Sequence, residues 1–261
     1  MRTAGARDHV LVKACLNGGR RRAEHDAVPI TPEQLAADAR AAVEAGAGAL
    51  HVHPRGTDER ETLDAEGSGR AITAIRRACP GVPVGVSTAA WIAPDPRARL
   101  ALIASWTVLP DFASLNLSEA GAAEVARALL RAGVGIEAGV WSLDDVHALV
   151  DSNLAGVCVR VLVEAQPLEA KEAVAAAAAI DAALDRAGIA VPRLHHGEGH
   201  ATWAVLDAAL DRARDIRIGL EDTLQRPDGR VAPHNADLIA EAVSMVRRHG
   251  YRPAPASLGP A

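Results

Sequence analysis

The stretch Ala49-Leu50-His51-Val52-His53 follows a helix-like segment and a break at Gly46 and Gly48, and this placement predicts a short strand. On a strand, residues two apart point to the same face, with their side chains about 6–7 Å apart along the chain. The imidazoles of His51 and His53, held in this way, are able to bind one metal ion. The alternative is that both histidines are hydrogen-bonded within the structure or lie on the surface without binding a metal, and the sequence alone leaves this open.

Short apolar runs of this kind alternate with Ala-rich amphipathic segments along the whole chain. The expected strands are Val10–Leu16, Ala49–His53, Pro83–Ser87, Phe112–Leu115, Gly135–Ala138, Gly156–Val161, Arg193–His196 and Ile216–Leu220. The expected helices are Pro32–Ala45, Gly69–Ala78, Pro96–Leu109, Ala120–Ala132, Leu143–Asp151, Leu168–Ala187, Ala201–Ala213 and Asn235–Arg248. Eight strands, each followed by a helix, predict an α/β fold of the (β/α)8 TIM barrel type.

A doubly wound open sheet is the rival architecture, and it usually carries a GxGxxG phosphate loop after its first strand. The segment Asn17–Arg22 lacks that spacing, so we favour the barrel. No linker divides the chain, which predicts one domain over residues 1–261. The Pro- and Ala-rich end, from about residue 252 to residue 261, is expected to be a flexible tail.

Composition limits the classes of function. The 261 residues are 49% hydrophobic but only 2% aromatic, so the core must consist of Ala, Val, Leu and Ile. A net charge of −5 argues against nucleic acid as a partner. The three cysteines are widely spaced and form no CxxC pair, which argues against a disulfide framework. Apolar runs too short to span a bilayer, and a polar N-terminus, predict a soluble cytoplasmic protein.

Polar residues gather at or just after the C-terminal ends of the expected strands, where barrel active sites are built. They are Asn17, His51, His53, Ser87, Thr88, Ser114, Asn116, Glu137, His195, His196, Arg217, Glu221 and Asp222. Glu221 follows the last strand and is a candidate third metal ligand beside the two histidines. Three N/O ligands with one open position are what a catalytic zinc site requires. Arg217 and Asp222 are then candidates for an oxyanion-stabilising group and a base, although a salt-bridged barrel mouth is the alternative.

With these segments in place, the chain resembles the β-keto acid cleavage enzyme family, which includes the 3-keto-5-aminohexanoate cleavage enzyme. The matching segments are Pro29–Glu33, Leu50–Arg55, Val86–Thr88, Ala113–Asn116, Arg217–Asp222 and Asn235–Leu238. They are spread over nearly the whole expected barrel, and the combination of HxH with RxGxED is specific.

The resemblance implies a zinc-dependent barrel that performs a retro-Claisen exchange, in which a β-keto acid and acetyl-CoA yield acetoacetate and a new acyl-CoA. It implies that Zn²⁺ is held by His51, His53 and Glu221, and that Arg217 and Asp222 form the acid/base pair. The substrate contacts expected from the resemblance and from the strand ends are Ser87, Thr88, Ser114, Asn116 and Asn17. Barrels of this type often form homo-oligomers, and a dimer or tetramer is expected.

Three positions depart from the family pattern. Relatives that act on an amino-substituted keto acid have an acid where this chain has Arg20, and a cation there suits an anionic or neutral substrate side chain. The family can carry an acid where this chain has Gly139. The loop Glu164–Pro167 is short, which puts CoA binding in question and favours, as the alternative function, a metal-dependent hydrolase or lyase that uses no CoA. A non-catalytic metal-containing binding protein is the third reading.

Overall fold

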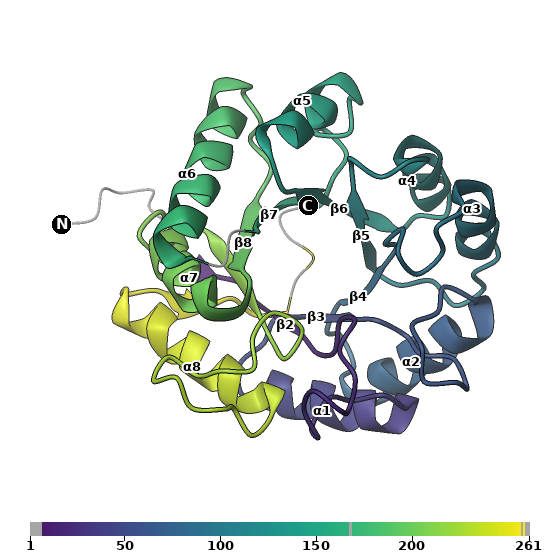
Figure 1. The fold of residues 1–261 in the computed structure, drawn as a ribbon, viewed down its shortest axis with the longest axis horizontal. Helices are drawn as coiled ribbons and strands as arrows, with labels where there is room; N and C mark the ends of the chain where they lie inside the picture. The colour runs from purple at the N-terminus through teal and green to yellow at the C-terminus, as the bar shows by residue number, and fades with distance from the viewer. Residues whose placement is uncertain (1–6, 167–168, 257, 259–261) are drawn as a thin grey trace.

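The computed structural model describes residues 7–166, 169–256 and 258, and its centre is a closed barrel of eight parallel strands. The strands follow one another around the barrel in chain order: β2 (Val12–Cys15), β3 (Ala49–Val52), β4 (Val84–Ser87), β5 (Phe112–Asn116), β6 (Gly135–Val140), β7 (Arg160–Ala165), β8 (Arg193–Gly197) and β9 (Asp215–Ile218). Figure 1 shows a ring of helices around these strands. The predicted (β/α)8 barrel is therefore confirmed.

The helices of the described chain alternate with the strands. They are α1 (Pro32–Glu44), α2 (Ala65–Ala78), α3 (Pro96–Ala104), α4 (Ala122–Arg131), α5 (Leu143–Asp151), α6 (Ala170–Arg186), α7 (Thr202–Leu210), preceded by the 3₁₀ turn η1 (Gly199–Ala201), and α8 (Asn235–Arg248). Helix α1 begins behind a capping box of Thr31 and Gln34, in which each side chain satisfies a backbone N–H of the first turn. Among these helices, none combines the length and the apolar character that crossing a membrane requires.

One predicted strand was misplaced. The sequence predicted a strand over Gly156–Val161, whereas β7 is Arg160–Ala165. Residues 156–158 instead lie in a turn after α5, where Val157 is exposed and donates its backbone N–H to the carbonyl of Leu154. Two β-branched runs adjoin here, and the hydrophobic pattern alone did not separate the turn from the strand. Glu164, expected in a loop, consequently lies on a barrel strand.

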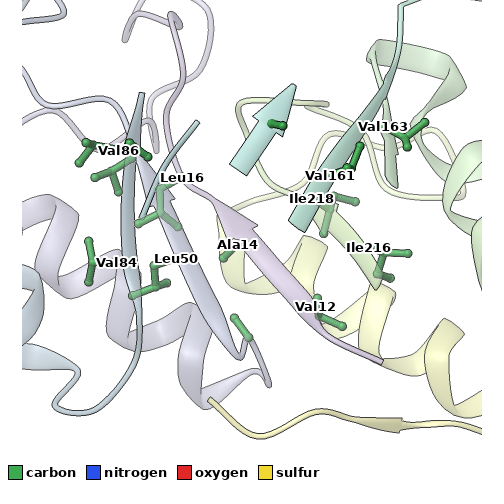
Figure 2. Packing of buried hydrophobic residues seen from close by; sticks show 14 of the residues in the cluster. Val12, Ala14, Leu16, Leu50, Val84, Val86, Val161, Val163, Ile216 and Ile218 are labelled. Carbon is green, nitrogen blue, oxygen red and sulfur yellow. The ribbon is translucent and has the colours of Figure 1, made fainter. Parts of the chain in front are cut away.

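Side chains alternate between the two faces of the barrel wall. The outward-facing aliphatic residues pack into a continuous core with the helices, and Figure 2 shows Val12 and Ala14 of β2, with Leu16 just after it, among them. The residues between them face the interior, where Lys13 forms an ion pair with Glu137 of β6. Because His51 pairs in register with Cys15 of β2, the same alternation turns the His51 side chain inward. The period of two thus places apolar groups under the helices and polar groups inside the barrel.

The N-terminal end of the barrel is closed by an apolar layer and by the chain end. Leu11, Ala49, Leu162 and Leu194 form a separate buried cluster, against which Ala254 packs. Two short strands, β1 (His9–Val10) and β10 (Arg252–Pro253), pair beside it. The expected flexible tail therefore begins with hydrogen-bonded backbone, while residues 257 and 259–261 lie outside the described part. The extent of the domain stays a prediction.

Candidate metal centre at the barrel mouth

Side chains from two segments that are far apart in the sequence meet at the C-terminal end of the barrel. His51 lies on β3, His53 directly follows this strand, and Glu221 lies in the loop after β9. Strands β3 and β9 both flank β2, so closure of the barrel brings their ends together. One ligand atom from each residue lies within 4.8 Å of the other two.

The geometry of the three side chains fits a divalent cation. Nε2 of His53 lies 3.1 Å from Nε2 of His51 and 3.6 Å from Oε1 of Glu221, and Nε2 of His51 lies 3.8 Å from Oε2 of Glu221. Ligand atoms that surround a tetrahedral zinc ion at about 2.0–2.2 Å are about 3.3–3.6 Å apart. Oε2 of Glu221 is buried without a hydrogen-bond partner, which suits an atom that serves as a ligand. A His2Glu set leaves a fourth position for water or substrate.

The charges around the three residues favour a cation. Burial lowers the pKa of His51, so its imidazole is neutral near pH 7. Burial opposes the charged form of His53 as well, but Glu221 and Glu61 outweigh it and raise the pKa of His53 to about 9. Burial also opposes ionisation of Glu221, yet Arg217 and the two histidines hold its pKa well below the usual range. The carboxylates of Glu221 and Glu61 therefore stabilise a positive charge beside them, carried either by a proton on His53 or by a metal ion.

Two loop residues orient the His53 ring from outside the centre. Nδ1 of His53 lies 2.5 Å from Oε1 of Glu61, in the loop after β3. The indole N–H of Trp91, after β4, donates to the same oxygen at 3.3 Å, and the indole stacks on the His53 ring with 6.3 Å between centroids. A carboxylate on the outer nitrogen of a metal-binding histidine fixes the ring and increases its basicity. Sequence reasoning missed both residues, although an acid shortly after an HxH motif was a usable signal for Glu61.

The loop after β2 supports the centre from the other side. The carboxamide of Asn17 accepts from the backbone N–H of His53 at 2.9 Å and donates to the backbone oxygens of His53 and Pro29. Its polar groups are therefore engaged in holding His53, and its expected contact with substrate stays a prediction. Gly18 has φ +52°, and a Cβ atom there would collide with the side chain of Glu221. Glycine is required at this position by both its backbone conformation and the close approach.

Arg217 and Asp222 form a buried ion pair directly beside Glu221. Nη2 of Arg217 donates to Oδ1 of Asp222 at 2.7 Å and to Oε1 of Glu221 at 2.5 Å, and Nε donates to Oδ1 of Asp222 at 3.0 Å. Burial opposes ionisation of Asp222, but Arg217 and His196 lower its pKa. The pair thus presents an ionised carboxylate next to the metal ligands.

The expected substrate contacts differ in how much of their hydrogen-bonding capacity remains. Ser87 and Ser114 are register partners on β4 and β5, and the Ser87 oxygen accepts only from the backbone N–H of Ala89. Thr88 donates its hydroxyl to the carbonyl of Ser114 at 2.6 Å. Asn116 donates to Glu119 at 2.8 Å. Thr88 is therefore engaged with backbone, while Ser87 keeps a hydroxyl proton to donate.

Two residues expected at the mouth lie elsewhere. Glu137 is fully buried in the barrel interior, where it pairs with Lys13 and lies 3.5 Å from Arg160. His195 points outward from β8, and its Nε2 lies 3.4 Å from Asp181 of α6. Sequence position placed both near strand ends, but the alternation of side chains and the depth along the strand decide which group reaches the mouth.

A second polar group lies across the mouth from the histidines. His196 of β8 is buried between Asp222 and Glu164 of β7, at 3.3 Å and 3.2 Å. A Cβ atom on Gly139 of β6 would lie 2.8 Å from Oε1 of Glu164 and 2.6 Å from Oδ1 of Asn116. The neighbouring strand therefore delivers a carboxylate to the space over Gly139, the position where the family resemblance predicted an acid.

A cavity of about 610 Å³ adjoins the centre, with Glu61 and Trp91 in its wall. Its lining includes four arginines from the loops after β2 and β3, namely Arg21, Arg22, Arg55 and Arg60, and three acids, namely Asp58, Glu59 and Glu61. Arg20 lies in the same first loop, and its guanidinium donates to the carbonyl of Leu220 and to Glu24. The entrance beside the metal centre is therefore rich in cationic side chains.

Comparison with known proteins identifies the family. A sequence model described as beta-keto acid cleavage enzyme matches residues 9–257. The 3-keto-5-aminohexanoate cleavage enzyme of Fusobacterium nucleatum is 38% identical over 82 residues, which cover 31% of this chain and 30% of that enzyme. The 3-oxoadipate:acetyl-CoA acetyltransferase of Cupriavidus necator is 37% identical over 68 residues, 26% of this chain and 24% of that protein. The aligned segments thus span less than a third of either curated relative.

Solved structures agree on the fold. A complex of ObcA with oxaloacetate superposes with a TM-score of 0.71 at 19% identity, covering 88% of this chain and 66% of ObcA. The 3-dehydroquinate dehydratase from Geobacillus kaustophilus superposes with a TM-score of 0.56 at 11% identity, covering 90% of this chain and 91% of that one. At these identities the similarity establishes the barrel alone.

Proposed function

This chain belongs to the β-keto acid cleavage enzyme family, and on that premise we propose that it is a zinc-dependent acyltransferase of the retro-Claisen type. It would convert a β-keto acid and acetyl-CoA into acetoacetate and a new acyl-CoA. The observation that carries the proposal is the convergence of His51, His53 and Glu221 at one point, directly beside the buried Arg217–Asp222 pair.

Each residue then has a chemical role. Bound zinc would supply Lewis-acid polarisation of the keto acid. Asp222 serves as the general base, because Arg217 keeps it ionised while Oδ2 has only a 3.4 Å contact with Nε of Arg217 and is free to accept a proton. Arg217 in turn balances the negative charge that develops nearby. Ser87 donates its free hydroxyl proton to the substrate, and the substrate contacts of Ser114, Asn116, Thr88 and Asn17 complete the proposed set.

The substrate is proposed to carry an anionic or neutral side chain. Arg20 places its guanidinium at the loop that carries Glu221, since its Nε donates to the carbonyl of Leu220 at 2.5 Å. A cation there disfavours a substrate ammonium group and favours a distal carboxylate. The names of two similar proteins, one with 3-oxoadipate and one with oxaloacetate, are consistent with a dicarboxylate.

The arginine-rich cavity supports an anionic co-substrate such as a CoA ester. Arg21, Arg22 and Arg60 reach it from exposed loop positions, where phosphate groups remain accessible to solvent. A complex of ObcA with a C4-CoA adduct shows that a protein of similar fold accommodates CoA.

A direct assay tests the proposal. Purified protein loaded with one equivalent of zinc is incubated with acetyl-CoA and a panel of β-keto acids, including 3-oxoadipate and 3-keto-5-aminohexanoate, and acetoacetate is measured. We expect acetoacetate with at least one dicarboxylate and none with His51→Ala, whose zinc content falls together with its activity. Silence of the zinc-loaded protein across the panel contradicts the proposal.

A metal-dependent hydrolase or lyase that needs no CoA is the second candidate. The observation that favours it is the short connection between β7 and α6, residues 166–169, of which 167 and 168 lie outside the described part. Turnover of a keto acid at the same rate without the CoA ester would establish this candidate, and an absolute requirement for the thioester would eliminate it. A homo-oligomeric state, dimer or tetramer, and a cytoplasmic location remain part of the proposal and are tested by light scattering and by fractionation.

A further inference from the structure

His196 is a buried residue at the barrel mouth to which the roles proposed above assign no function. It lies on β8 and is 6% exposed, between the carboxylates of Asp222 and Glu164. Neither β8 nor β7 contributes a metal ligand. His196 therefore contacts the proposed base from a strand that carries no metal ligand.

The two ring nitrogens face different partners. Nδ1 lies 3.3 Å from Oδ1 of Asp222 and 3.3 Å from the carbonyl oxygen of Gly197. Nε2 lies 3.2 Å from Oε2 of Glu164, without the alignment of a hydrogen bond. Burial and Arg217 lower the pKa of His196, but Asp222 and Glu164 outweigh them and raise it, which favours a charged imidazolium between the two carboxylates.

The contacts on Asp222 are concentrated on one oxygen. Oδ1 receives Nη2 of Arg217 at 2.7 Å and Nε of Arg217 at 3.0 Å, and Nδ1 of His196 approaches it as well. Oδ2 has only the 3.4 Å contact with Nε of Arg217. The arrangement holds one oxygen from two directions and leaves the other for a proton.

Arg217 holds this carboxylate through both Nε and Nη2. Its Nη2 also donates to Glu221, so this guanidinium serves a metal ligand and the base together. His196 comes from β8 and Glu164 backs it from β7, so these two residues support Asp222 from strands that carry no metal ligand. Contacts from two strands restrict the orientation of the Asp222 carboxylate more than the contacts of Arg217 alone.

We propose that His196, backed by Glu164, is a positioning residue that fixes the orientation of the Asp222 carboxylate for proton transfer. The inference rests on the proposed role of Asp222 as the base. It adds a Glu164–His196–Asp222 array to the Arg217–Asp222 pair.

The test replaces His196 by two amides of different length. In His196→Asn the side-chain nitrogen occupies the place of Nδ1 and keeps the contact with Asp222. In His196→Gln it occupies the place of Nε2 and keeps only the contact with Glu164. We expect kcat of H196N to stay within about threefold of wild type, and kcat of H196Q to fall about 100-fold with KM changed less than about twofold, as for a misplaced base. The matched controls are H200N and H200Q, which alter an exposed histidine on the adjoining 3₁₀ turn.

Equal kcat values for H196N and H196Q, or a loss confined to KM, would overturn the proposal. Crystal structures of both variants give a readout that needs no turnover: the Asp222 carboxylate keeps its orientation in H196N and rotates in H196Q. An unmoved carboxylate in H196Q also refutes the inference. If the wild-type protein is silent on the keto-acid panel, the proposed function fails, and the crystallographic comparison still decides the positioning role.

Discussion

Replacement of Glu61 by Gln tests whether the loop beyond His53 tunes the metal centre. Glu61 makes no contact with the ligand position itself, but its Oε1 lies 2.5 Å from Nδ1 of His53. Glutamine keeps an oxygen at that place and removes the charge. The substitution therefore isolates the electrostatic part of the contact.

The expected loss follows from the hydrogen bond. A bond to a charged group contributes about 1.5–3 kcal/mol and a neutral one about 0.5–1.5 kcal/mol, so E61Q should weaken zinc binding by about 1–2 kcal/mol. This difference is about 5- to 30-fold in Kd. This predicted loss of zinc affinity overlaps the roughly 10- to 100-fold loss of metal affinity that follows removal of a carboxylate hydrogen-bonded to a metal-binding histidine in other proteins.

Competition with a chromophoric zinc chelator at pH 7.5 measures the affinity. The control is E59Q, because Glu59 lies in the same loop, is exposed and is two residues away. We expect E59Q to bind zinc as wild type does. Zinc affinity of E61Q within twofold of wild type would show that the Glu61–His53 contact does not act on the centre, and the reasoning from geometry would be wrong.

Three further perturbations follow from contacts in the structure. Gly18→Ala should weaken zinc binding by an order of magnitude or so, measured by the same competition, because a Cβ atom collides with Glu221 and the positive φ alone costs about 1–2 kcal/mol. Lys13→Met leaves the buried Glu137 without its closest cation, and urea denaturation should show a loss of about 3–5 kcal/mol in the free energy of unfolding. Asp38, whose pKa burial raises from 3.8 to about 6, destabilises the fold when ionised, so the penalty is absent below pH 4 and complete above pH 6. Asp38→Asn should therefore increase the free energy of unfolding by about 2–3 kcal/mol at pH 8 and leave it unchanged at pH 4, and equal effects at both values would contradict this assignment.

The barrel was predictable because its signals are local and repeated. Each strand is a short apolar run, and helices such as α1 and α5 carry start signals that place their first residues at Pro32 and Leu143, as expected. The misplaced strand at Gly156–Val161 shows the limit of this reasoning. Two β-branched runs lie side by side there, and burial against α6, which no local pattern encodes, selects the second one.

The residues of the candidate site likewise fall into those that the sequence predicted and those that it did not. His51, His53 and Glu221 were predictable because barrel closure converts strand order into proximity. Trp91 was not, because it lies in a loop whose path depends on packing with other loops, and for Glu61 the one local signal was an acid shortly after the HxH motif. His196 was seen as a polar residue, but its approach to Asp222 depends on which face of β8 turns inward, and a neighbouring histidine made that choice ambiguous.

The pairing of β1 with β10 brings the first and last described strands to the face opposite the mouth. A short peptide joining these two strands would therefore link neighbours, and a new break placed in an exposed turn, such as residues 152–153, would give a circularly permuted chain with the same ring of strands. A carrier protein or a surface attached beside β1 or β10 would likewise stand away from the entrance. Immobilised in this way, the barrel would keep its open end turned toward the solution.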